Sequence, residues 1–206
     1  MSATHKAMPS SMTGLFAEKQ DLSIKKTLIR MFGASRFKSE TFKELKDDPH
    51  ATLQSFLLVP ITGLCYGLGL SLFGLFVVGF SASTTVLITL LGLVLGCSIA
   101  LIWSLTSFLI VNRLFNRTIS YLSLARPFFF SWSPGLLFIL LLIPNPLVSE
   151  GVRVLASAWV GVASVFAVKH AGGLSFQQSM MTFIISILTL VLAQIILESL
   201  LPSLIT

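Results

Sequence analysis

Residues 86–111 read VLITLLGLVLGCSIALIWSLTSFLIV, and no charged side chain interrupts them. This stretch exceeds the roughly 20 apolar residues that a helix needs to cross the hydrocarbon core of a membrane. Similar segments occur at about residues 53–80, 119–143, 152–168 and 176–197. The sequence therefore predicts an all-α, polytopic integral membrane protein with about five transmembrane helices.

The composition agrees with this class of protein. Of the 206 residues, 54% are hydrophobic and only 11% are charged, with a mean hydropathy of +0.91. A soluble domain of this size cannot bury so much apolar surface, so hydrocarbon must be part of its solvent. Charged residues gather in the first fifty positions, which predicts a basic amino-terminal arm at 1–48 and a membrane domain at 49–206.

The basic residues predict the orientation, because cytoplasmic loops retain Lys and Arg. In a five-helix arrangement, one side of the membrane receives the arm with Lys6 and Lys19 and the loop residues Arg113, Arg117 and Lys169. The other side receives Glu150, Arg153 and Glu198. We therefore expect a cytoplasmic amino terminus and a carboxyl terminus on the opposite side. The location would be the inner (plasma) membrane of a prokaryote or an endomembrane of a eukaryote. An arrangement of four helices, without the short fourth span, would put Lys169 on the side opposite to the other basic loops, which conflicts with this rule.

The arm contains an amphipathic pattern. On a helical wheel, one side carries Ile24, Leu28, Met31 and Phe32, and the other carries Ser23, Lys26 and Arg30. Such a helix suits a membrane surface, where cations meet anionic head groups. The alternatives are a helix packed against the membrane domain of the same chain, or an unordered tail.

Helix boundaries are also readable. Thr41 and Glu44 have the spacing of a capping box, which predicts a short helix that starts there and stops near Asp47 and Asp48. Pro49 suits the first turn of the first span. Ser175 and Gln178 repeat the capping-box spacing at the start of the fifth span.

Small residues four apart predict close helix packing inside the membrane. These positions are Gly63, Gly67, Gly92, Gly96, Ser157 and Gly161. They fit either packing within one chain or a dimer interface. The third helix should be irregular, since Pro127, Pro134 and Gly135 weaken its hydrogen-bond ladder. A broken helix can line a transport site; alternatively, Ser131 and Ser133 satisfy the kink.

Arg126 falls inside the third span, where a charge costs roughly 2.5 to 3.5 kcal/mol. It could snorkel toward Arg113, Arg117 and Lys169 and form a basic pocket for a lipid phosphate or an acidic group of a partner. Alternatively, the third helix begins near Phe128 and leaves Arg126 at the interface. The candidate contacts to anionic lipid or a partner are Lys25, Lys26, Arg30, Arg113, Arg117, Arg126 and Lys169.

No arrangement of reactive residues points to catalysis. The histidines have no His-Glu-x-x-His spacing, and no predicted span contains an aspartate. Cys65 and Cys97 lack metal-ligand spacing. We therefore expect no catalytic, metal-binding or cofactor-binding residue and no enzymatic activity. The expected partners are membrane lipids, anionic on the cytoplasmic face, and other membrane proteins or a second copy of the chain, without a nucleic acid.

Several landmarks occur in a distinctive order: FKELKDDP and ATLQSF within residues 42–56, SPGLLFILLLIP at 133–144, AVKH at 167–170 and LSFQQSM at 174–180. This order resembles the Yip1 domain family of five-span membrane proteins, especially its prokaryotic branch. The resemblance implies five spans and a cytoplasmic amino terminus. Members that bind Rab-type GTPases carry an Asp-Leu-Tyr-Gly-Pro motif; this chain lacks it, so that role is not implied, and no binding residue transfers.

These observations favour a non-enzymatic membrane scaffold or accessory subunit that packs with partner proteins and lipids. The alternative is a small transporter or channel for an anionic solute or lipid, built around the kinked third helix.

Overall fold

A computed structural model of the chain describes residues 23–205, with side chains described for residues 23–195. Our predictions on Lys6, Lys19 and Glu198 concern side chains outside these ranges. The described elements are all helices: α2 (Ile24–Ser35), α3 (Ser39–Asp47), η1 (Pro49–Ala51), α4 (Thr52–Phe73), η2 (Gly74–Val78), α5 (Ala82–Leu109), η3 (Ile110–Leu114), α6 (Tyr121–Phe130), η4 (Ser133–Leu142), α7 (Pro146–Gly172) and α8 (Phe176–Ile205).

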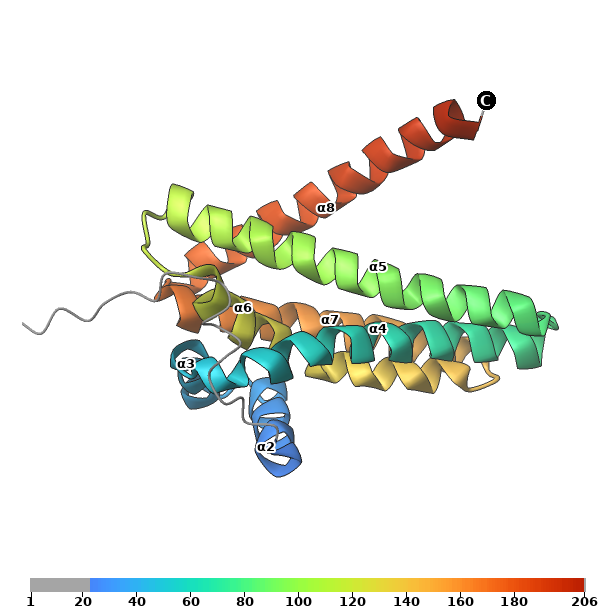
Figure 1. Ribbon diagram of the computed structural model, residues 1–206, viewed down its shortest axis with the longest axis horizontal. Coiled ribbons are helices and arrows are strands. Elements are labelled where there is room, and N and C mark those ends of the chain that lie inside the picture. Colours follow the sequence, from blue (N-terminus) through green and yellow to red (C-terminus); the bar gives the residue numbers. More distant parts are fainter. Residues whose placement is uncertain (1–22, 206) are drawn as a thin grey trace, which may run out of the picture.

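Five helical segments are long and apolar enough to cross a membrane, which confirms that part of the prediction. They are Pro49–Val78, Ala82–Leu114, Tyr121–Leu142, Pro146–Gly172 and Phe176–Ile195. The fourth is longer than the sequence suggested, because Asn145 caps its first turn and Pro146 begins it. Figure 1 shows α4 and α5 running alongside each other and α7 lying in roughly the same direction, while α8 diverges toward the carboxyl terminus.

The third span lies at the centre of the bundle. In its most apolar window 72% of the residues are buried, compared with 11% for the second span. Phe128 and Phe129 are fully buried and, with Trp132, belong to the main core cluster. The third span is therefore enclosed by protein, whereas the second span buries few of its side chains.

The third span is irregular, as predicted. It is an α-helix up to Phe130 and, after a turn at Ser131 and Trp132, a 3-10 helix from Ser133 onward. Pro127 lies inside α6, whereas Pro134 occupies the first turn of η4. Ser131 supplies a hydrogen bond at the break, since its hydroxyl donates to the Phe128 carbonyl. The same hydroxyl lies 2.9 Å from the Ser164 hydroxyl of α7.

Glycines bring α4 and α5 together within the chain. A Cβ at Gly67 would lie 2.5 Å from the Thr89 carbonyl oxygen, and one at Gly96 would lie 2.8 Å from the Cα of Gly63. A Cβ at Gly92 would collide with the Gly67 backbone. The fourth span differs from this pattern: Gly161 packs against the Phe183 ring, but Ser157 is exposed.

One predicted helix start is confirmed and the other is wrong. Ser175 accepts from the Gln178 N–H at 3.2 Å, and Gln178 accepts from the Ser175 N–H at 3.0 Å, as a capping box requires. Helix α3, by contrast, begins at Ser39, so Thr41 lies inside it. The Glu44 carboxylate accepts a hydrogen bond from Arg30 and not from a backbone N–H at the start of the helix.

Candidate functional site

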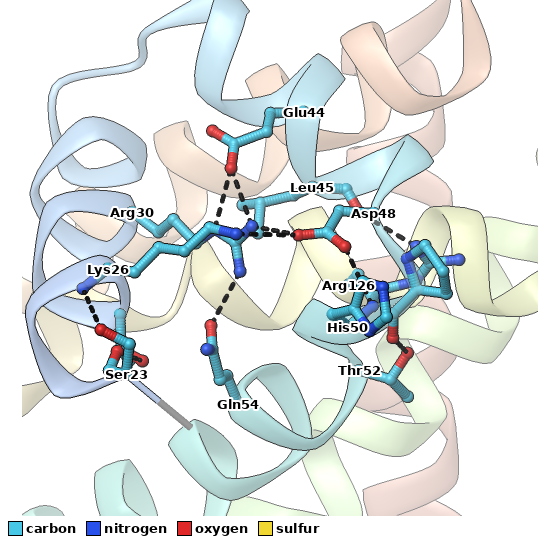
Figure 2. A network of polar contacts seen from close by, with 12 residues as sticks. Ser23, Lys26, Arg30, Glu44, Leu45, Asp48, His50, Thr52, Gln54 and Arg126 are labelled. Carbon is cyan, nitrogen blue, oxygen red and sulfur yellow. Dashed lines mark hydrogen bonds and ion pairs between the residues drawn. The ribbon is translucent and has the colours of Figure 1, made fainter. Parts of the chain in front are cut away.

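The amino-terminal arm is attached to the membrane domain by a buried arginine. Arg30 of α2 is 1% exposed, and its guanidinium donates to two helices. Nε and Nη2 bond Glu44 Oε1 at 3.1 and 2.7 Å, Nη2 also bonds Asp48, and Nη1 bonds Gln54 Oε1 at 2.9 Å (Figure 2). Because Gln54 belongs to α4, this one side chain ties α2 to α3 and to the first span.

Asp48 is the acidic centre of this network. It caps η1 by accepting from the His50 N–H at 3.0 Å, and the Lys26 ammonium lies 3.6 Å from its Oδ2. Burial by itself raises the pKa of the Asp48 carboxyl, but hydrogen bonds from Arg30 and the His50 N–H, and the charges of Arg30 and Lys26, outweigh it. The pKa of Asp48 therefore lies below its ordinary value of 3.8.

The carboxyl end of α2 is bound by two other spans. The Ser133 hydroxyl donates to the Met31 carbonyl at 3.0 Å and lies 2.9 Å from the Ser35 hydroxyl. The Trp159 indole N–H donates to the Ser35 carbonyl at 2.8 Å. The last carbonyl groups of a helix have no partner inside the helix, and here the Trp159 indole of α7 supplies one for the Ser35 carbonyl.

Helix α3 packs on the bundle through apolar side chains. Phe42 and Leu45 are fully buried, and the Phe42 ring stacks on His170 with centroids 6.0 Å apart. Between α2 and α3, the Phe37 ring stacks on Phe166 at 5.2 Å. Residues 23–48 therefore pack as part of the helical bundle, which is one of the alternatives that the sequence left open for the arm.

Arg126 lies against the carboxyl end of α3, and the third span begins at Tyr121, so the predicted start near Phe128 is wrong. It is 7% exposed, and it donates to the carbonyls of Leu122 at 3.1 Å and Leu45 at 3.4 Å. Leu45 is in the last turn of α3, where the helix dipole favours a cation. Figure 2 shows Arg126 on the far side of Asp48 from Arg30. The carboxyl end of α3 thus lies between two buried arginines.

The other predicted cations are dispersed. Lys25, Arg113 and Arg117 are exposed, whereas the Lys169 ammonium lies 5.8 Å from the Phe166 ring centroid and 6.0 Å from that of Phe176. Arg126 is bound to backbone carbonyls elsewhere. Arg30, a predicted lipid contact, is instead enclosed by protein, where its carboxylate partners are Glu44 of α3 and Asp48 directly after that helix.

The apolar face of α2 points outward. Ile24, Leu28, Ile29 and Phe32 are 56–76% exposed, while Arg30, Gly33 and Ala34 are buried. Met31, which the helical wheel placed with the apolar group, packs instead in the inner cluster around Phe42 and Leu45. The helix therefore uses its polar face to bind the protein and leaves its apolar face uncovered within the described structure.

Sequence reasoning missed the partners of Arg30, namely Glu44, Asp48 and Gln54. A signal was present, because Glu44 in the last turns of α3 and Asp48 directly after the helix are only four residues apart, which keeps the two carboxylates close together. No comparable pattern in the sequence predicts that the Trp159 indole donates a hydrogen bond to α2. Among the described residues, no group of three or more His, Cys, Asp or Glu side chains could hold a metal ion.

Comparison with known proteins adds no identification. No family model, no curated protein and no solved structure matches this chain. The geometry of the docked arm therefore carries the functional argument.

Proposed function

We propose that this protein is a non-enzymatic membrane scaffold or accessory subunit, whose docked α2 and α3 form a fixed platform on the cytoplasmic face. The observation that carries the proposal is the inward use of Arg30. Its clamp holds α2 so that Ile24, Leu28 and Phe32 face away from the protein. A platform of fixed shape with exposed apolar groups is suited to binding other membrane components.

The proposed orientation has the amino terminus in the cytoplasm and the carboxyl terminus on the other side. It is supported by the exposed Arg113 in the last turn of the second span, by the exposed Arg117 just after it, and by Lys169 at the end of the fourth span. The resemblance to the Yip1 domain family agrees with this orientation. Membership of that family is part of the proposal, and tagging each terminus and testing its accessibility in sealed vesicles checks the orientation.

The experiment that tests the scaffold proposal is purification of the full chain from its native membrane in mild detergent, with identification of the proteins that accompany it. We expect a membrane protein in stoichiometric amount. Recovery of a partner-free monomer that catalyses a reaction would refute the proposal. Mock purification from cells that lack the tagged chain controls for proteins that adhere to the resin.

A small transporter or channel for an anionic solute or lipid is the second candidate. It is favoured by the break in the third span and by Trp132, whose buried indole N–H has no hydrogen-bond partner among the described residues. The adjacent interior, lined by Phe128, Ser164 and Phe183 among others, has no room for a water molecule, so a path would require helices to separate. Anion flux into liposomes that is unchanged by Trp132→Phe would count against this candidate.

A further inference from the structure

An open groove of about 480 Å³ follows the outward side of the arm. It is lined by Leu28, Ile29, Phe32 and Gly33 of α2, Lys38 of the turn and Thr41 of α3. Sites that bind small molecules have volumes of roughly 300–1,000 Å³ and are mostly apolar with a few polar groups. Among the lining residues only Lys38 is charged, so the groove combines apolar walls with one cation.

The groove is a consequence of how the arm docks. Gly33 lets the two helices approach, because a Cβ there would lie 3.1 Å from the Thr41 Cβ and Cγ2 and closer still to its hydroxyl. The Arg30 clamp fixes the rotation of α2, which turns Leu28, Ile29 and Phe32 toward the groove. The apolar walls are therefore held in place by buried polar contacts on the opposite side of the same helix.

The surroundings indicate what the groove binds. Figure 1 shows α2 lying across the direction of α4, α5 and α7, so it would run along the membrane surface if those helices cross the bilayer. Helices of this kind bury an apolar face among acyl chains. The Arg36 guanidinium lies 5.1 Å from the Phe32 ring centroid, which adds a second cation beside the groove.

We propose that this groove binds an anionic phospholipid, with an acyl chain against Leu28, Ile29 and Phe32 and the phosphate near the Lys38 ammonium. The inference rests on the membrane location proposed above. Glu40 lies near Lys38, but it is exposed and has Lys43 beside it as well, so the local balance stays positive. The anionic head group is favoured by charge complementarity, because a surface cation contributes on the order of 1 kcal/mol to binding an anionic membrane.

The test uses the full chain in vesicles that contain photoactivatable phosphatidylglycerol with a diazirine in its acyl chain. Labelled residues are mapped by mass spectrometry, and phosphatidylcholine with the same chains serves as the neutral comparison. We expect label on Leu28, Ile29 or Phe32, about fivefold more from phosphatidylglycerol, because ~1 kcal/mol corresponds to that ratio. Lys38→Ala should remove the preference, and the matched control Lys25→Ala, exposed on the same helix but outside the groove, should keep it.

The exposed side chains of α5, such as Leu90 and Val94, provide the internal reference for general lipid contact. Label on α5 without label in the groove would overturn the proposal and mean that something else covers the groove, such as residues 1–22 or a partner protein. Equal labelling by both lipids, or a preference unchanged in Lys38→Ala, would also overturn it. Such a failure leaves the recovery of a membrane-protein partner unaffected, so the scaffold proposal is judged separately.

Discussion

Replacing Arg30 with alanine should release the arm from the membrane domain. The guanidinium is 1% exposed, and its removal leaves the Asp48 carboxylate, 16% exposed, without its main partner and takes away the hydrogen bond that Arg30 donates to Gln54. Removing one member of a buried ion pair costs roughly 3–5 kcal/mol. Glu44 is half exposed and regains water, so we place the cost at the lower end, about 3 kcal/mol. The population of the undocked arm should then rise about 150-fold.

Hydrogen exchange of the full chain in nanodiscs measures this population, because amides exchange when their element opens. We expect the amides of α2 to exchange faster by about two orders of magnitude in Arg30→Ala, while the amides of α5 are unchanged. Lys25→Ala, on the exposed side of α2, is the matched control and should behave like the wild type.

Two further variants separate charge from packing. Arg30→Lys keeps the charge but loses the planar fork of donors, so its exchange should be intermediate. Arg30→Met combined with Asp48→Asn should recover part of the protection, since no buried charge is then left without a partner. Protection of α2 in Arg30→Ala within threefold of the wild type would refute the reasoning.

Three other perturbations test separate parts of the fold. Because the pKa of Asp48 is lowered, its contribution to arm docking is present above pH 3.8 and is lost as the pH falls below that value, so the protection of the α2 amides relative to their intrinsic exchange rates should fall there and Asp48→Asn should abolish this pH dependence. Gly67→Leu should destabilise the α4–α5 contact by about 1–3 kcal/mol, seen as a lower midpoint of thermal unfolding in detergent, whereas Gly151→Ala, where a Cβ meets nothing within 4 Å, should not lower it. Trp159→Phe keeps a ring but loses the 2.8 Å bond to Ser35, which should weaken the last turn of α2 by about 1 kcal/mol in hydrogen exchange, and equal protection in both proteins would contradict this role.

The spans were predictable because they depend on length and hydropathy, which are local properties of the chain. Residues 86–111 decide the class by themselves, and the Ser175 capping box depends only on four consecutive residues. The start of α3 was placed too late, since Thr41 and Glu44 match the pattern of a cap but Glu44 is used by Arg30. A local pattern cannot reveal such a distant competitor.

The docked arm was not predictable in the same way. A helical wheel separates Arg30 from Leu28 and Phe32, but it does not say which side faces the protein. That choice depends on Glu44, Asp48 and Gln54, which are 14 to 24 residues away from Arg30. The hydrogen bond from Trp159 joins residues 124 positions apart, and nothing in the local sequence marks it.

The central claim is that α2 is docked on the third span, and disulfide trapping in native membranes tests it most directly. Ser35→Cys and Ser133→Cys are introduced together in a chain that carries Cys65→Ala and Cys97→Ala. The two serine hydroxyl oxygens lie 2.9 Å apart, so the new thiols should be close enough to pair. Lys25→Cys with Ser133→Cys is the control, because position 25 is about 15 Å along the helix from position 35.

Mild oxidation should close an intramolecular disulfide between positions 35 and 133 and leave the control pair reduced. Free thiols at positions 35 and 133 under the same oxidant, or equal cross-linking of the control pair, would contradict the docked arm.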